Sequence, residues 1–406
     1  MAGSGAERGE AEAGRADRPD RAESERRLEE LRGAARAFAE RAARYELAAW
    51  ERAGRIPADA HARAGQAGML GVGFDESVGG RGGGLGAVAA MLEEVIGVGG
   101  SVGLAVALVQ HRQALGLVTA AGDRAQIEAY VRPALAGQRV AALALAEPYG
   151  GADVSAMRTR ATRDGVSFVV DGAKSYVTGG ARSDFFVVAV RTGAPGRDGL
   201  SLLLVDSATP GLRVTRQLDM MGWWCLDVAE LVFDGVHVPA RNLVGGDGDG
   251  YQALMLGAPA DRLCTAALAG VAAARCLALA AEHAARRSVF GGPLADKGVI
   301  RHRLAAMARR VELARCYTRH VIELEAAGAD VIAESAIAKA EAERACLAVA
   351  ADAVQIHGAA GLVRGNEIER HYRDVRMLGA VSGSEELMNE IIAGWFGYGE
   401  ARLGLW

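Results

Sequence analysis

Hydrophobic positions recur every three or four residues in the first third of the chain. Over 27–68 this is the spacing of one apolar helix face, with members at Leu28, Leu31, Ala35, Phe38 and Ala42. A glycine-rich connection over 71–84 follows, and Ala-rich segments with a helical pattern continue to about residue 135. The pattern therefore predicts an N-terminal helical domain over residues 26–140.

From about residue 141 to 246 the period changes to two. Short runs that alternate or stay apolar lie between Gly, Pro and Asp residues, which is typical of strands, at 185–190, 200–205, 212–215 and 231–238. We also predict a hairpin within 167–178, where Asp171-Gly172 separates two strand-like runs. Residues 141–246 are expected to form a central β-barrel or β-sheet domain.

After Gly250 the helical spacing returns. Apolar residues between Ile300 and Leu324 mark one face of a long helix, and a second long helix is predicted over 332–357. Because a short Ala-Gly-Ala-Asp connection joins them, the two helices should pair antiparallel in a bundle. Residues 247–406 are thus predicted to form a C-terminal four-helix bundle, in an α+β multidomain chain with the order helices, sheet, helices.

Composition and charge narrow the choice of partners. The chain carries 46 Lys and Arg against 50 Asp and Glu, and a net charge of -4 gives no reason to expect nucleic acid or an anionic membrane. Five cysteines without a CxxC pair argue against a disulfide framework or a metal site and favour a reducing cytoplasm. Apolar segments such as 263–274 end in charge, short of the roughly 18 to 20 residues that cross a bilayer, so no membrane span is predicted.

The N-terminal segment, residues 1–25, is rich in Ala, Gly, Arg and acidic residues and has no apolar centre. It resembles neither a secretory signal nor a transit peptide, and we expect a disordered tail.

Candidate chemistry lies in an acidic-Pro-Gly-Gly turn and in the strand that follows it. Gly150 and Gly151 permit backbone conformations closed to other residues and let a ligand approach the main chain. Tyr176 and Thr178 are two apart on the predicted strand, so they share a face and offer a ring and a hydroxyl to a flat heteroaromatic ligand. An ordinary hairpin with one surface Tyr and one surface Thr has the same local pattern.

Several dispersed motifs follow one another along the chain. They are AEPYGGAD at 146–153, KSYVT at 174–178, MGWW at 221–224, VHVP at 236–239, RSVFGGPL at 287–294, QIHGAAG at 355–361 and YRD at 372–374. In this order, and together with the succession of helices, sheet and helices, they resemble the acyl-CoA dehydrogenase family over nearly everything after the tail.

The resemblance implies FAD as the cofactor. It places the isoalloxazine ring against the turn and the following strand, at Leu145, Ala146, Ala152, Tyr176, Val177 and Thr178. Further cofactor contacts, some of them to the FAD of a neighbouring subunit, are implied for Arg287, Phe290, Gln355, Gly358, Ala359 and Ser384. A homotetramer or a heteromer with a related chain follows, with electron-transfer flavoprotein as the expected electron acceptor. Taken alone, Arg287 is a solvated cation at a helix end and Gln355 a polar residue on a bundle helix.

The family reaction removes the α-proton of an acyl thioester with a carboxylate while the flavin takes a hydride from the β-carbon. Many members carry the base as a Glu after the Tyr-Arg-Asp segment, and Ser382 occupies that position here. Other members carry a Glu before an Arg near the start of the first long C-terminal helix, where this chain has Asp261-Arg262. The resemblance therefore makes Asp261 the candidate base, and Arg262 and Gly383 candidate substrate contacts.

Two other interpretations concern nearby carboxylates. Because Pro259 precedes it, Asp261 also fits the first turn of a helix, where the helix dipole favours an acid. Glu385 and Glu386 lie close to Ser382 in sequence but are expected to open the last helix. As a base, Asp261 is one methylene shorter than Glu, and a misplacement of about 1 Å costs roughly 10²-fold in rate.

Other departures from the family pattern remove hydroxyl and amide groups near the cofactor, at Ala146, Ala152, Leu226, Val228 and Gly298. Each loss removes a hydrogen bond worth roughly 0.5 to 1.5 kcal/mol. Retention of FAD then depends on backbone contacts and on Thr178, Arg287, Gln355 and Ser384.

Three functional hypotheses follow from these residues. The first is a flavin-dependent dehydrogenase that acts on an acyl-CoA or a carrier-protein-bound acyl thioester. The second is a non-catalytic or repurposed relative, either a subunit paired with an active homologue or a biosynthetic enzyme. The third is a flavin monooxygenase or oxidase on the same scaffold.

Overall fold

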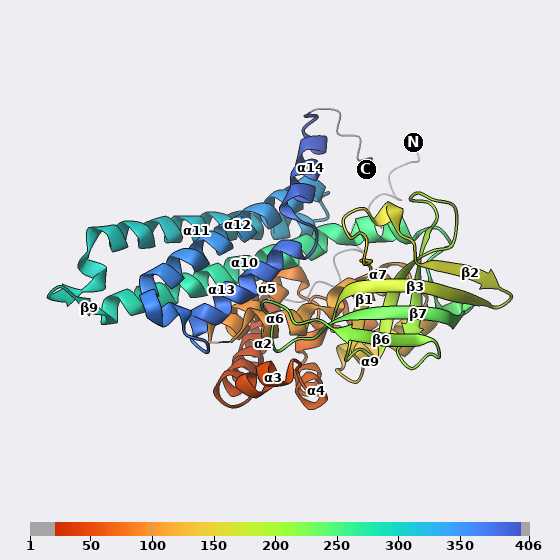
Figure 1. Cartoon of the computed structure of the whole chain (residues 1–406), viewed down its shortest axis with the longest axis horizontal. Coiled ribbons are helices and arrows are strands. Elements are labelled where there is room, and N and C mark those ends of the chain that lie inside the picture. The colour runs from red at the N-terminus through yellow and green to blue at the C-terminus, as the bar shows by residue number, and fades with distance from the viewer. Residues whose placement is uncertain (1–20, 99, 399–406) are drawn as a thin grey trace, which may run out of the picture.

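The computed structural model describes residues 21–98 and 100–398, which form two helical regions with a β-sheet between them in sequence (Figure 1). The N-terminal helices agree with the predicted helical domain: α2 (Arg21–Arg41), α3 (Leu47–Ala53), α4 (Ala58–Gln66), α5 (Gly84–Gly97), α6 (Val102–Val109), α7 (His111–Ala121), α8 (Arg124–Gln126) and α9 (Arg132–Leu135). Short 3-10 and π segments join them: η1 (Ala42–Glu46), η2 (Met69–Gly71), η3 (Glu76–Val78) and η4 (Ile127–Val131). Helix α2 begins at Arg21, inside the predicted tail, whose remainder lies outside the described residues.

The β region contains the strands that the period of two predicts. They are β1 (Ala141–Ala144), β2 (Arg160–Asp164), β3 (Ser167–Thr178), β4 (Phe185–Arg191), β5 (Leu200–Asp206), β6 (Leu212–Gln217), β7 (Val228–Pro239) and β8 (Leu243–Val244), with η5 (Val154–Ala156) and η6 (Ala240–Asn242) between them. The strands pair in the order β6-β7-β3-β2-β4-β5-β8, and β1 pairs with β4 in parallel. Most pairs are antiparallel, so the region is one mixed sheet.

The predicted hairpin within 167–178 is wrong, because these residues form the single strand β3. Strands β2 and β7 pair with its two edges, and the register with β7 shifts between Val170 and Gly172. Asp171 therefore lies in a β-bulge rather than a turn, and its Oδ1 accepts a hydrogen bond from the Gly235 N–H at 2.8 Å. Pairing on both edges outweighs the local Asp-Gly turn preference.

Strand β4 is buried on both faces, which explains its continuous apolar run. Phe185, Val187 and Ala189 pack with α7 and η4 in one apolar cluster, whereas Phe186, Val188 and Val190 pack in a second cluster with residues of β3 and β7. Helices therefore cover one face of the sheet.

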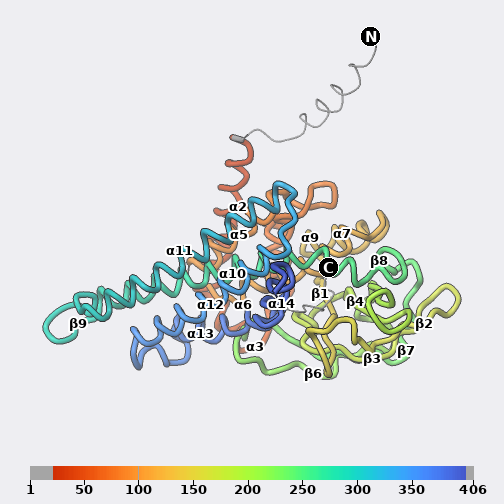
Figure 2. The backbone as a smooth tube through the Cα atoms, turned by 90° about the horizontal axis from the view of Figure 1, so that it is seen from above, coloured from red at the N-terminus to blue at the C-terminus, as the bar shows by residue number. Residues whose placement is uncertain are grey.

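The C-terminal helices form an elongated bundle that extends away from the sheet and ends at β9 (Figures 1 and 2). Its elements are α10 (Gly250–Arg286), β9 (Ser288–Val289), β10 (Gly292–Pro293), η7 (Leu294–Asp296), α11 (Gly298–Ala326), α12 (Ile332–His357), η8 (Gly358–Leu362), α13 (Glu367–Met377), η9 (Leu378–Ala380) and α14 (Glu385–Trp395). The second predicted long helix matches α12 at both ends. Pro259 lies inside α10, so the prediction of a helix start at this proline is wrong.

Two helical stretches, Gly250–Arg286 and Ile332–Leu362, are long and apolar enough to cross a membrane by length and composition alone. This differs from the expectation for short apolar segments, because α10 continues well beyond 263–274. In the apolar window of α10, 72% of the residues are buried inside the fold, as in the core helix of a globular protein, against 39% in the second stretch. One or two such helices are weak evidence for a membrane span.

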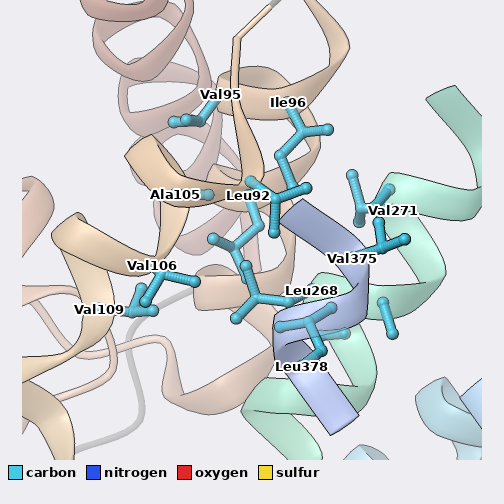
Figure 3. Close-up of a cluster of buried hydrophobic side chains, with 14 of the residues drawn as sticks. Leu92, Val95, Ile96, Ala105, Val106, Val109, Leu268, Val271, Val375 and Leu378 are labelled. Carbon is cyan, nitrogen blue, oxygen red and sulfur yellow. The ribbon is translucent and has the colours of Figure 1, made fainter. Parts of the chain in front are cut away.

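The N-terminal helices and the bundle share one apolar core (Figure 3). In Figure 3, Leu92 and Ile96 of α5 and Val106 of α6 face Leu268 of α10 and Val375 of α13. The helical regions at the two ends of the chain therefore pack as one body.

Asp374, from the Tyr-Arg-Asp motif, holds that junction together. Its buried carboxylate accepts hydrogen bonds from Ser101 Oγ at 2.8 Å, Gly103 N at 3.1 Å and Trp223 N at 2.7 Å. One motif of the resemblance thus has a structural role that joins α13, α6 and the Met-Gly-Trp-Trp loop.

Candidate active site

Asp261 lies at a meeting point of three segments that are distant in sequence. Ser382 Oγ donates a hydrogen bond to Asp261 Oδ2 at 2.6 Å, and Gln113 Nε2 of α7 donates to the same oxygen. Burial raises the pKa of the Asp261 carboxyl, and these two donors oppose it by favouring the charged form. A half-buried carboxyl with a raised pKa inside a helix is not the solvated first-turn acid of the alternative interpretation.

Gln113 is a residue that the sequence analysis missed. It lies in α7, whose sequence HRQALGLVTAA matches none of the motifs, so the sequence gave no reason to select it. Its partner is 148 residues away in the chain, so only the fold brings the two together.

The segment that carries Ser382 has an unusual backbone. Ser382 has a φ of 57° and Gly383 one of 95°, so two successive residues adopt the left-handed region. Lys339 Nζ of α12 donates a hydrogen bond to the Gly383 carbonyl, and the fully buried Lys339 also pairs with Glu343 at 2.8 Å. The buried lysine anchors the segment, and the sequence analysis did not identify it.

The residues after this segment form a helix start, as predicted for Glu385 and Glu386. Both lie in the first turn of α14, and Glu385 pairs with Arg344. Ser384 is the N-cap, with its hydroxyl accepting from Leu387 N at 3.4 Å. Neither Glu385 nor Glu386 makes a hydrogen bond to Asp261.

Arg262 is a nearly buried arginine next to the candidate base. Its side chain lies in the core with 7% exposure, and its Nε has no hydrogen-bond partner among the described residues. Burial lowers the pKa of Arg262, and the nearby Asp261 charge opposes this.

The predicted cofactor turn is fixed to β3 by a buried ion pair. Glu147 Oε1 lies 3.1 Å from Lys174 Nζ, which also donates to the Leu145 carbonyl at 3.0 Å. Ser175 N donates to the Ala146 carbonyl at 2.9 Å. Two of the motifs that carried the resemblance thus contact each other directly, and Leu145 and Ala146 lie at this junction.

Gly150 and Gly151 do not adopt the left-handed conformation that the sequence analysis expected. Neither is among the residues with positive φ, and a Cβ at Gly150 would meet no atom within 4 Å. The turn, in which Ala152 is exposed, therefore does not require glycine at these positions for backbone reasons.

Tyr176, Val177 and Thr178 lie at the end of β3 with alternating exposure. The Tyr176 ring is 63% exposed, Val177 is buried and Thr178 is partly exposed, as predicted for residues that alternate between faces. Tyr176 has a φ of 58° at a second shift of register between β3 and β7, so it is a strained residue in a bulge. Directly after Thr178, Gly179 lies against the amide of Gln110, whose oxygen and nitrogen are both buried without a partner among the described residues.

The remaining predicted cofactor contacts lie at the far end of the bundle. Arg287 and Phe290 are exposed around β9, and Gln355, Gly358 and Ala359 are exposed where α12 ends. The rings of His283 and His357 lie 4.4 Å apart between their centroids, which brings the two groups together. At about 1.5 Å per residue, the part of α10 between Asp261 and Arg287 is roughly 39 Å long. Within a single chain, the candidate base and these cofactor contacts therefore lie far apart.

A surface cavity of about 580 Å³ lies between η4 and the sheet, and Tyr130, Asp206, His237 and Asn242 line part of it. None of the predicted site residues borders it. The candidate site is therefore defined by its hydrogen-bond geometry rather than by this cavity.

Comparison with known proteins agrees with the fold. Family models match residues 25–138 (acyl-CoA dehydrogenase, N-terminal domain), 142–236 (middle domain) and 248–396 (C-terminal domain). The chain is 30% identical over 345 residues to an acyl-CoA dehydrogenase of Bacillus subtilis, covering 84% of this chain and 90% of that protein.

Solved structures give the same result. A probable acyl-CoA dehydrogenase from Mycobacterium abscessus is 48% identical with a TM-score of 0.89, covering 90% of this chain and 98% of that one. The prolyl acyl carrier protein oxidase AnaB is 25% identical with a TM-score of 0.86, covering 91% and 98%. The chain therefore belongs to the acyl-CoA dehydrogenase family.

Proposed function

We propose that this protein is a flavin-dependent dehydrogenase that forms an α,β double bond in an acyl thioester, with Asp261 as the base. The observation that carries the proposal is the geometry of Asp261. Its carboxyl is half-buried, and Ser382 and Gln113 both donate hydrogen bonds to its Oδ2. Arg262 is the next residue in the chain. The family resemblance also assigns the base to the position of Asp261-Arg262.

The residues around Tyr176 fit FAD. The exposed ring of Tyr176 offers a flat surface, and the orphaned amide of Gln110 lies beside Gly179 at the end of the same strand. A buried amide without a partner is costly, and a heteroaromatic ligand edge can satisfy it. FAD, when bound, accepts the hydrogen of the β-carbon as a hydride.

Asp261 removes the α-proton. Burial raises the pKa of Asp261 towards the working range of a general base, while the hydrogen bonds from Ser382 and Gln113 favour the carboxylate and oppose this rise. The nearly buried Arg262 supports the charged state without an ion pair within hydrogen-bond distance. Because aspartate is one methylene shorter than glutamate, its carboxyl reaches less far from α10. The α-carbon of the substrate must therefore bind closer to α10 than it would beside a glutamate.

A second subunit completes each cofactor site in this proposal. Because roughly 39 Å of helix separate Asp261 from Arg287, the exposed Arg287 and Gln355 serve the FAD of a neighbouring copy. The planar guanidinium of Arg287 suits the diphosphate. A homotetramer with electron-transfer flavoprotein as electron acceptor is the arrangement that we propose.

The test is spectroscopic. Purified protein is expected to bind FAD, and an acyl thioester added without oxygen should bleach the flavin absorbance in the wild type but not in Asp261→Asn. Arg310→Ala is the matched control, because it removes only a surface ion pair in which Arg310 lies 3.3 Å from Asp352. Its flavin should bleach like that of the wild type. Protein that takes up no FAD, or Asp261→Asn that bleaches at the wild-type rate, would contradict the proposal.

A carrier-protein-bound thioester is the second candidate substrate, favoured by the likeness to AnaB. Offering the same acyl group on CoA and on a phosphopantetheinyl carrier protein separates the two. A preference of tenfold or more in kcat/KM assigns the carrier. If the FAD-loaded protein oxidises neither thioester but its reduced flavin consumes oxygen, the oxidase or monooxygenase hypothesis replaces this one.

A further inference from the structure

The two oxygens of Asp261 have different surroundings. Both hydrogen bonds that the side chain receives within 21–98 and 100–398, from Ser382 Oγ and from Gln113 Nε2, end on Oδ2. Oδ1 receives none of them, and it is not among the buried atoms that lack a partner. Oδ1 is therefore the oxygen that remains accessible.

A second hydroxyl supports the first. Thr265 Oγ1 lies 2.9 Å from Ser382 Oγ and 3.1 Å from the Asp261 carbonyl oxygen, one turn further along α10. Each hydroxyl has one proton, and that of Ser382 is committed to Oδ2. The Thr265 hydroxyl is then the donor to Ser382 Oγ, and it shares its one proton between this oxygen and the Asp261 carbonyl. The hydrogen bonds therefore run from Thr265 to Ser382 and from Ser382 to the Asp261 carboxylate.

Ser382 reaches this place only through a strained backbone. A non-glycine residue at a φ of 57° is uncommon, and it persists when its surroundings hold it. The Lys339 contact to the Gly383 carbonyl supplies such a constraint from α12. Strain that points a hydroxyl at a carboxylate is a reason to assign the hydroxyl a function.

We propose that Ser382 is the positioning residue of the base. With Gln113 it holds the Asp261 carboxylate by Oδ2, so that Oδ1 faces the substrate and receives the α-proton. The α-C–H bond would break, an O–H bond would form at Oδ1, and the electron pair of the broken bond would enter the new double bond, while the β-hydrogen would leave as a hydride, for which a bound flavin would be the acceptor. This inference rests on the proposed function and adds a role for the serine that stands where many relatives have a glutamate.

The first test compares Ser382→Ala with the wild type as holoenzymes. We expect kcat to fall by about tenfold to a hundredfold because the base is no longer held in place. KM and FAD content should stay unchanged. The acidic limb of the kcat–pH profile should move to higher pH, because loss of a donor disfavours the carboxylate.

A second readout needs neither substrate nor turnover. The infrared carboxyl band of Asp261, identified as the difference from Asp261→Asn, is titrated with pH. Its midpoint should be higher in Ser382→Ala than in the wild type. This measurement separates the two proposals, since it responds to the hydrogen bond even if no thioester is oxidised.

Matched variants test the supporting hydroxyl. Thr265→Val removes the donor at constant shape and should shift the profile in the same direction as Ser382→Ala, whereas Thr265→Ser keeps the hydroxyl and should resemble the wild type. Thr119→Val is the control, because Thr119 Oγ1 makes a comparable bond to the Gly116 carbonyl at 3.0 Å on α7. If Ser382→Ala and Thr265→Val leave kcat, the pH profile and the infrared midpoint unchanged, the positioning role is wrong.

Discussion

Lys174 Nζ and Glu147 Oε1 lie 3.1 Å apart in the interior of the β region, with exposures of 0% and 9% for their side chains. Glu147 also accepts hydrogen bonds from Arg158 N at 2.8 Å and Thr159 N at 2.7 Å. Burial lowers the pKa of Lys174 to about 8, and the Glu147 charge opposes this. The pair therefore joins the predicted cofactor turn to the strand that carries Tyr176.

Replacing Lys174 with Met should destabilise the protein by about 3 to 5 kcal/mol, because it leaves the Glu147 carboxylate buried without its cation. The double variant Lys174→Met, Glu147→Gln removes that charge and should recover a large part of the loss. Urea unfolding of the three proteins measures the difference. Equal stability of the single and double variants would show that the pair is not coupled.

Asp261→Asn should stabilise the fold at neutral pH while it slows turnover. Burial raises the pKa of Asp261 in the folded chain, so the folded state binds this proton more tightly than the unfolded state. The stability that this provides is present at low pH and is lost as pH rises through the folded pKa. The variant avoids that loss, so its gain in Tm over the wild type should grow from pH 4 to pH 8, and kcat should fall about 10² to 10⁴-fold.

Moving the base should restore part of that activity. The family resemblance assigns Ser382 to the position of a glutamate base, and its side chain reaches Asp261 Oδ2. The double variant Asp261→Asn, Ser382→Glu is therefore expected to turn over at least about tenfold faster than Asp261→Asn. Ser382→Gln in the same background supplies the matched control without a carboxylate. Identical rates for the two double variants would count against this geometry.

The bundle should lose stability in acid through Glu367. Burial raises the pKa of Glu367, but the bonds from His371 and Arg275 outweigh it and lower the pKa from 4.5 to about 2. A lowered folded pKa gives stability above pH 4.5 that is lost as pH falls towards 2. Glu367→Gln should cost about 3 kcal/mol at pH 7 and remove this dependence. Chemical unfolding at pH 7, 4 and 3 checks both parts.

Two inactive variants should complement each other if subunits share cofactor sites. Asp261→Asn keeps Arg287, and Arg287→Ala keeps Asp261. Co-expression of the two chains forms hybrid sites in which one copy contributes the base and its neighbour contributes the arginine. Activity in the purified mixture well above that of either parent is the expected result. Absence of recovery, with hybrid oligomers demonstrated by distinct tags, would mean that both groups of a site come from the same subunit.

The sequence pattern predicted the fold well where burial is regular. The apolar run of β4 and the helical pattern of α12 gave correct elements because each pattern reports directly on which faces are packed. Asp171-Gly172 misled, since a local turn preference carries no information about strands on both edges.

The candidate site was only partly predictable. Asp261 was accessible through a motif, whereas Gln113 and Lys339 act through contacts that exist only after folding. The left-handed backbone at Ser382 has no signature in residue type, because serine rarely adopts it.

Helix α10 is continuous from Asp261 to its end at Arg286, next to Arg287. Inserting a single residue between Asp261 and Arg287 would rotate one relative to the other by about 100° and lengthen the helix by about 1.5 Å. An insertion of seven residues would nearly preserve the angle but move the arginine outward by about 10 Å. In the proposed oligomer, in which Arg287 serves the FAD of a neighbouring copy, the length of this one helix would set the spacing between neighbouring reaction centres, and a change in it would disturb two of them at once.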